Sequence, residues 1–408
     1  MPHGAGPAPR VARPTNVRRG ALTVALGAAL AVTLVCGLAA AAGCGGATTG
    51  GGSRRAASAA DPYLSLRSPG SSPSPRPGAR VLAVGMPLLI VASADGGATW
   101  RTAHSTAPKD PFTQVLFGVC FGDARHGWAV GKGLTIVATA DGGATWTTQR
   151  PASGGDDLLA VAASDARHVW AVGFTHDRSL GVVLASADGG RTWTDQYDGA
   201  DVLSAVTFAD ARHGWAAGTT GILATSDGGA RWVLQRPLSR FYRLNDVRFT
   251  DARHGWAVGG TGSAVVKPGF IMATSDGGRH WRLQLSGTRD RLNGVSFVSD
   301  RRGWAAGNEG QLCTTTDGGA HWTLKALDPH WELGGLAFGD ARHGWLIVHP
   351  QWEPDVVAST DGDEWSALRQ LTLLSTSDGG ATWSAVLTAR DVPAPAILTH
   401  VACREPGT

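Results

Sequence analysis

The side chains in this sequence that could do chemistry recur in two motifs. The motif D-A-R-H places a histidine three residues after an aspartate, at His126, His168, His213, His254 and His343. The motif S/T-x-D-G-G-x-x-W carries one aspartate in each copy, as at Asp141 and Asp227. Imidazole and carboxylate groups are common ligands of zinc and calcium, so a metal site is the first chemistry to consider.

The repetition of these side chains argues against a metal. Equivalent histidines fall in successive repeats, too far apart to share one ion, and each aspartate turn offers one carboxylate where calcium takes roughly six to eight oxygens. We therefore expect turn or inter-repeat hydrogen bonds from the histidines, capping by the aspartates, and no metal or cofactor. Asp361–Glu364 is the densest acidic turn and the alternative calcium site.

Glycoside hydrolysis is the second chemistry to consider, because it uses a pair of carboxylates. The sequence has three tyrosines, and its glutamates are Glu309, Glu332, Glu353, Glu364 and Glu405. Hydrolysis would therefore have to rely on aspartates. We predict no catalytic residues, and we keep a cell-surface carbohydrate-binding protein or glycosidase as the alternative function.

The aspartate motif occurs seven times, with its tryptophan at Trp100, Trp146, Trp193, Trp232, Trp281, Trp322 and Trp383. The intervals are 39 to 49 residues, except the last, which is 61 residues and contains a shortened copy at Ser359–Trp365. A four-stranded propeller blade has a similar period. Most of the 16 tryptophans recur at repeated positions, so we assign them to packing between blades.

Each repeat can be divided into four short strands. In one repeat these are Leu203–Phe208, Gly214–Gly218, Ile222–Ser226 and Arg231–Gln235. Glycine is abundant, at 57 residues, and charged residues are only 17%, as suits short strands joined by tight turns. The sequence predicts an all-β fold, a seven-bladed β-propeller over residues 81–408.

The two ends of the repeat region complement each other. The first repeat begins at Val81 with VLAVG, which matches a second strand, whereas Leu398–Cys403 matches a first strand such as Leu116–Phe121. We expect the C-terminal strand to complete the N-terminal blade, which would remove open sheet edges.

The run SADGGATW resembles the Asp-box, or BNR, repeat of sialidases, sortilin-type receptors and xyloglucan-cleaving glycosidases. The paired pattern FGDARHGWAVG and IVATADGGATW is most similar to the photosystem II stability/assembly factor family. This resemblance covers about residues 81–403 and implies a seven-bladed propeller. In photosynthetic organisms, members of that family act as assembly chaperones for membrane complexes, but a propeller fold does not by itself define a function.

The N-terminus predicts export. Arg10, Arg13, Arg18 and Arg19 precede an apolar run over residues 20–43 that ends at Cys44. The run AAGC resembles a lipobox, with Cys44 as the lipidated residue; an uncleaved anchor and a twin-arginine signal are the alternatives. Residues 1–44 form this segment, and the Gly-, Ser- and Pro-rich residues 45–80 form a flexible tether.

Three cysteines fall in the propeller region, at Cys120, Cys313 and Cys403. Cys120 and Cys403 align one position apart on neighbouring first strands, so their side chains face opposite sides. We predict no disulfide between them.

Topology indicates the binding surface. Both tight repeated turns lie at one end of the strands, so the irregular connections lie on the opposite face, where binding usually resides. These connections carry a basic, aromatic arc that consists of Arg236, Arg240, Phe241, Tyr242, Arg243, Arg289, Arg291, Trp331 and Trp352, with His330 beside it. Arginine and aromatic residues are typical of interface hot spots.

The sequence therefore predicts a non-catalytic scaffold that binds a protein of the cell envelope through this arc. A glycan is the alternative ligand. The net charge of +3 is too small to indicate nucleic acid. We expect a monomer on the extracytoplasmic face of the membrane, or a secreted protein if the segment is cleaved without lipidation.

Overall fold

The computed structural model describes residues 79–404 apart from 107–113, 177–179, 198, 200–201, 262–267, 351–371, 389–390 and 392–396. Every described residue belongs to one compact unit, which falls within Gly37–Thr408. The export segment, the tether, Cys44, Trp352 and the acidic turn Asp361–Glu364 lie outside the described residues.

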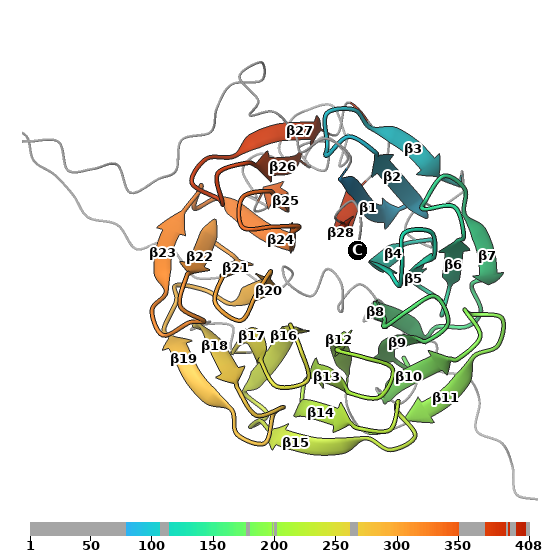
Figure 1. The fold of residues 1–408 in the computed structure, drawn as a ribbon, viewed down its shortest axis with the longest axis horizontal. Coiled ribbons are helices and arrows are strands. Elements are labelled where there is room, and N and C mark those ends of the chain that lie inside the picture. The colour runs from blue at the N-terminus through green and yellow to red at the C-terminus, as the bar shows by residue number, and fades with distance from the viewer. Residues whose placement is uncertain are drawn as a thin grey trace, which may run out of the picture. The chain divides into compact units, whose positions relative to one another are not determined.

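The described residues form seven four-stranded antiparallel sheets arranged as the blades of a propeller (Figure 1). Within blades 2 to 7 the strands follow chain order from the centre of the ring to its outer edge (Figure 1). This confirms the all-β, seven-bladed propeller expected from the repeats.

The first four blades contain β28 (Ile397–Arg404), β1 (Arg80–Met86), β2 (Leu89–Ser93) and β3 (Arg101–His104); β4 (Leu116–Phe121), β5 (Gly127–Gly131), β6 (Ile136–Thr139) and β7 (Thr147–Arg150); β8 (Asp157–Ala163), β9 (Val169–Phe174), β10 (Gly181–Ser186) and β11 (Thr194–Tyr197); and β12 (Leu203–Phe208), β13 (Gly214–Gly218), β14 (Gly221–Thr225) and β15 (Val233–Pro237). The first two strands of blade 4 match those expected from the sequence, whereas the third lies one residue earlier and the last lies two residues later, at Val233–Pro237 rather than Arg231–Gln235. The backbone N–H of Arg231 instead donates to Asp227 in the preceding turn.

The last three blades contain β16 (Tyr242–Phe249), β17 (Gly255–Thr261), β18 (Gly269–Thr274) and β19 (Arg282–Ser286); β20 (Leu292–Phe297), β21 (Gly303–Gly307), β22 (Gln311–Thr315) and β23 (Thr323–Ala326); and β24 (Trp331–Phe338), β25 (Gly344–Pro350), β26 (Thr372–Thr376) and β27 (Ser384–Thr388). The second and third strands of the blades are buried along most of their length, because neighbouring blades cover both faces. Continuous apolar or small-residue sequences suit such strands.

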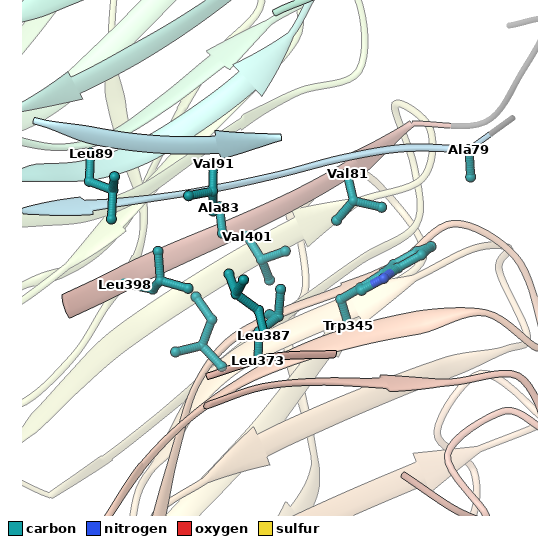
Figure 2. Packing of buried hydrophobic residues seen from close by; sticks show 11 residues of the cluster. Ala79, Val81, Ala83, Leu89, Val91, Trp345, Leu373, Leu387, Leu398 and Val401 are labelled. Carbon is teal, nitrogen blue, oxygen red and sulfur yellow. The ribbon is translucent and has the colours of Figure 1, made fainter. Parts of the chain in front are cut away.

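Blade 1 is built from both ends of the described region. Strand β28 pairs antiparallel with β1, with Val401 opposite Ala83 and Cys403 opposite Val81. Figure 2 shows the apolar cluster beside this junction, where Val81 and Val401 of blade 1 pack near Trp345 of blade 7. The N- and C-terminal sequences therefore share one blade and one core.

Tryptophans join each blade to the next. The ring of Trp170 stacks on Phe208 of blade 4, with 3.5 Å between ring centroids. Its indole N–H donates to the carbonyl of Gly228 at 2.9 Å. The same stack recurs in the pairs Trp215–Phe249, Trp256–Phe297 and Trp304–Phe338. Each contact is worth about 0.5–1.5 kcal/mol beyond the area it buries, which confirms the packing role expected for these tryptophans.

Candidate functional site

The two repeated turns meet at the same end of each blade. In blade 2 the backbone N–H of Gly142, in the aspartate motif, donates to the carbonyl of Arg125, in the D-A-R-H turn, at 2.8 Å. Equivalent bonds join Gly189 to Arg167 and Gly228 to Arg212. The irregular connections between blades must therefore lie on the opposite face, as the sequence predicts.

The repeated histidines belong to these turns. His126 Nδ1 lies 2.8 Å from the carboxylate of Asp123, whose other oxygen accepts the backbone N–H groups of Arg125 and His126. The same His–Asp contact recurs at His168, His213, His254 and His343. The turn-forming role expected for these histidines is confirmed.

The aspartates of the second motif cap their own turns. Asp141 accepts the hydroxyl of Thr139 at 2.8 Å and the backbone N–H and hydroxyl of Thr145. Gly142 and Gly143 have φ values of 74° and 86°, which suit glycine. The hydroxyl of Thr145 and the other donors lower the pKa of Asp141 well below its usual range. The capping role is therefore confirmed.

Four exposed members of the arc lie at the junction of blades 4 and 5. Phe241 is 61% exposed, and the guanidinium group of Arg240 lies 5.1 Å from its ring centroid. Tyr242 packs edge-on against Phe270, with 5.7 Å between ring centroids. Arg236 is exposed on β15. Two aromatic rings and two guanidinium groups are therefore accessible together.

Two further arginines of the arc are more enclosed than the sequence predicts. Both were expected in irregular connections, but Arg243 is half-buried on β16 and Arg291 is only 8% exposed, immediately before β20. Burial and the neighbouring charge of Arg291 lower the pKa of Arg243. Arg243 Nε has no hydrogen-bond partner among the described residues. The two guanidinium groups concentrate positive charge beside the exposed rings.

The remaining members of the arc continue along the next blades. Arg289 is exposed, and its backbone N–H is held by the side chain of Gln311 at 2.9 Å. Trp331 is half-buried at the start of β24, where its carbonyl accepts the N–H of Gly310. These positions are strand ends and short connections, so the rigid blades fix them more firmly than long loops would.

Arg248, an arginine that faces the central channel, was not identified by the sequence analysis. Arg248 lies on the inner strand β16 opposite Trp256, and its side chain is exposed. The equivalent residues of the other inner strands are small: Cys120, Ala162, Thr207, Ser296, Ala337 and Ala402. Burial, and secondarily the Arg248 charge, lower the pKa of His400 on β28 to about 4. Because β28 lies across the ring from β16 (Figure 1), Arg248 points toward the centre. A position-by-position comparison of the repeats would have found it.

A pocket of about 470 Å³ lies between blades 2 and 3 on the face of the tight turns. Trp128, Arg167, Asp188 and Arg191 are among its lining residues. The hydroxyl of Thr192 is the main cause that lowers the pKa of Asp188 to about 2, so this carboxylate stays ionised at neutral pH and is unsuited to general acid catalysis.

In the part of the chain that the structure describes, no group of three or more His, Cys, Asp or Glu side chains is placed to hold a metal ion. Cys120 packs between blades 2 and 3, whereas Cys403 packs in the cluster between blades 1 and 7. No helix in the described ranges is long and apolar enough to cross a membrane.

Comparison with known families identifies the chain. The family model of the photosynthesis system II assembly factor YCF48 matches residues 106–197, 196–289 and 234–334. The chain belongs to this family. The matched ranges cover blades 2 to 6, including the junctions that carry most of the basic and aromatic arc. No curated protein matches the sequence.

Several solved structures are similar to this chain. A structure of YCF48 bound to D1 peptide is 20% identical, with a TM-score of 0.50, and the match covers 68% of this chain and 84% of that chain. YCF48 from Cyanidioschyzon merolae is 20% identical, with a TM-score of 0.47, covering 69% and 86%. A GH74 xyloglucanase from Xanthomonas campestris is 17% identical, with a TM-score of 0.49, covering 67% and 45%. At 20% identity, the likeness to the first of these structures concerns the fold alone.

Proposed function

We propose that this protein is a non-catalytic scaffold that binds an envelope or membrane protein through the arc on its loop face. The observation that carries this proposal is the junction of blades 4 and 5, where Arg240, Phe241 and Tyr242 are exposed beside the half-buried Arg243. Arginine and aromatic side chains on a rigid support lose little conformational entropy on binding and dominate protein interfaces.

The arc favours an acidic, extended segment of the partner. Arg243 and Arg291 lie close enough for the charge of one to lower the pKa of the other, so a carboxylate between them would relieve their repulsion. Arginine can hold such a carboxylate with two parallel hydrogen bonds. A peptide ligand in the solved complex of YCF48 with D1 peptide supports a peptide-binding role for this family.

The proposed place of action is the extracytoplasmic face of the cell membrane. The arginines at residues 10–19, the apolar run to residue 43 and Cys44 support export and anchoring. A tether of residues 45–80 would reach on the order of 30 Å from the membrane. The propeller would therefore meet clients that are themselves in or near the membrane.

The proposal is tested by affinity capture from detergent-solubilised native envelopes. The full chain is compared with a variant carrying Arg240→Ala, Tyr242→Ala and Arg243→Ala. Loss of hot-spot side chains costs about 2 kcal/mol or more each, so we expect at least about 30-fold weaker capture of the client. The matched control is Arg212→Ala, Arg253→Ala and Arg301→Ala, which removes three exposed arginines from the opposite face.

Capture that survives the arc variant, or that falls equally with the control variant, would contradict the arc as the binding site. Turnover of polysaccharide by the wild-type chain, lost on replacing one aspartate, would instead support the glycosidase alternative. Capture of a protein that is lost only with the arc variant supports the scaffold and identifies its client.

A further inference from the structure

The exposed apolar side chains of the propeller are concentrated on one side. The large hydrophobic residues that remain exposed in the described ranges are Val233, Leu234, Phe241, Tyr242, Leu283 and Leu324. All of them fall in blades 4 to 6, between β15 and β23. Monomeric proteins expose single apolar residues at scattered positions, whereas a group on one side indicates a contact surface.

Three of these residues occupy the same position in consecutive blades. Leu234, Leu283 and Leu324 each follow the tryptophan of the aspartate motif by two residues, on β15, β19 and β23. They are 46%, 60% and 45% exposed, respectively. We call these three residues the leucine rim, because their strands form the outer edge of the ring (Figure 1).

The other blades do not place leucine there. The equivalent residues are Thr102, Thr148, Asp195 and Ala385, and the first three of these are exposed. The repeat therefore permits a polar residue at this position, and packing within a blade does not require leucine. A role outside the propeller core explains why leucine is confined to one side.

The charged side chains on the three strands of the leucine rim are positive. Strands β15, β19 and β23 contain no Asp or Glu, and each carries one exposed basic residue: Arg236, Arg282 and Lys325. By contrast, β11 in blade 3 carries Asp195 at the leucine position. Apolar tips flanked by arginine and lysine are typical of surfaces that lie at the interface of an anionic bilayer.

The placement of the leucines favours a bilayer over a protein partner. Each leucine lies on the outer edge strand of a different blade, so the rim presents separate apolar tips along a convex edge (Figure 1). Protein hot spots instead cluster at the centre of a packed interface. Each fully buried leucine side chain contributes roughly 1.5–3 kcal/mol, so three partly inserted side chains suit a weak, reversible surface contact.

We propose that the leucine rim, with Arg236, Arg282 and Lys325, rests on an anionic phospholipid surface and holds the propeller edge-on at the membrane. This inference rests on the membrane tether of the proposed function, because a short tether turns a weak surface contact into an intramolecular one at roughly millimolar effective concentration. It does not depend on the protein client, and it shares only Arg236 with the arc.

Amide hydrogen exchange of the full chain in lipid nanodiscs tests the contact. One preparation contains phosphatidylcholine alone, and the other contains equal amounts of phosphatidylcholine and phosphatidylglycerol. We expect exchange in β15, β19 and β23 to slow by about tenfold in the anionic nanodiscs, because lipid excludes water from these edge strands. Exchange in β3 and β7, on the outer edges of blades 1 and 2 across the ring from the rim (Figure 1), is expected to stay the same.

The test variant is Leu234→Ser, Leu283→Ser and Leu324→Ser, and the matched control is Thr102→Ser, Thr148→Ser and Asp195→Ser. Protection should disappear in the first and persist in the second. Equal exchange in both lipids, or protection that survives the leucine variant, overturns the inference. If the chain enters neither nanodisc, both the membrane tether and the lipid contact are contradicted. If the rim is protected but no client is captured, only the scaffold function is contradicted.

Protection of the rim that requires addition of a captured protein client would also overturn the inference, because it would assign the leucines to a protein interface. Capture by the leucine variant provides an independent check. Since these residues are not part of the arc, the variant should retain the client at wild-type level.

Discussion

Replacing Ala163 by Phe and Val169 by Gly, the residues found in the neighbouring blades, tests whether side chains on the first and second strands compete for one volume. In five blades a phenylalanine at the end of the first strand lies opposite a glycine at the start of the second: Phe121–Gly127, Phe208–Gly214, Phe249–Gly255, Phe297–Gly303 and Phe338–Gly344. Blade 3 has Ala163 opposite Val169, and blade 1 has Cys403 opposite Val81.

The structure explains this pairing. A Cβ atom added to Gly214 would lie 2.3 Å from ring atoms of Phe208, and one added to Gly255 would lie 2.4 Å from the ring of Phe249. The ring and a side chain on the second strand therefore compete for the same volume. Where the ring is absent, valine fills part of the space.

Ala163→Phe alone should destabilise the protein by about 1–3 kcal/mol, because the ring would overlap Val169. Val169→Gly alone should cost roughly 3 kcal/mol, from the lost burial of the side chain and the added backbone freedom. In the double variant the ring can lie over Trp128 as Phe208 lies over Trp170 at 3.5 Å. We expect a favourable coupling energy on the order of 2 kcal/mol.

The assay is a double-mutant cycle of the free energy of unfolding, from urea titrations followed by tryptophan fluorescence, with equal m-values required for all four proteins. The reverse exchange, Phe208→Ala with Gly214→Val, is the control in blade 4 and should show coupling of the same sign. Additive effects of the two substitutions in both blades would refute the competition for one volume.

Two further predictions concern charge. The caps of the aspartate motif lower the pKa of Asp188 from 3.8 to about 2, mainly through the Thr192 hydroxyl. Because the pKa of Asp188 is lower in the folded state, the cap stabilises the protein above pH 3.8 and this stabilisation is lost as the pH falls toward 2. In Asp188→Asn the urea midpoint should therefore decrease less between pH 3.8 and pH 2 than in the wild type. Separately, Arg248→Ala should raise the pKa of His400, now about 4, because a like charge is removed, and NMR titration of the imidazole measures it. The control is Arg240→Ala, which removes an exposed arginine and should leave the pKa of His400 unchanged. If Arg248→Ala also leaves the pKa of His400 unchanged, Arg248 lies away from the centre of the ring.

Local sequence determined the strands, the turns and the number of blades. The hydroxyl, carboxylate and glycine of each aspartate turn contact one another within a few residues, as Thr139, Asp141 and Gly143 do. Such contacts can be inferred from spacing alone. The complementary ends at Val81 and Cys403 are also visible as sequence patterns, and they pair in the structure.

Tertiary structure decided which side chains are accessible. Arg243 and Arg291 were expected on an open face, but strand pairing and the adjacent blade enclose them. Arg248 is exposed on the innermost strand of its blade, whereas Leu234 is exposed on the outermost strand of its blade. Exposure depends on the position of the neighbouring blades, about forty residues away along the chain, and local sequence patterns do not record that position.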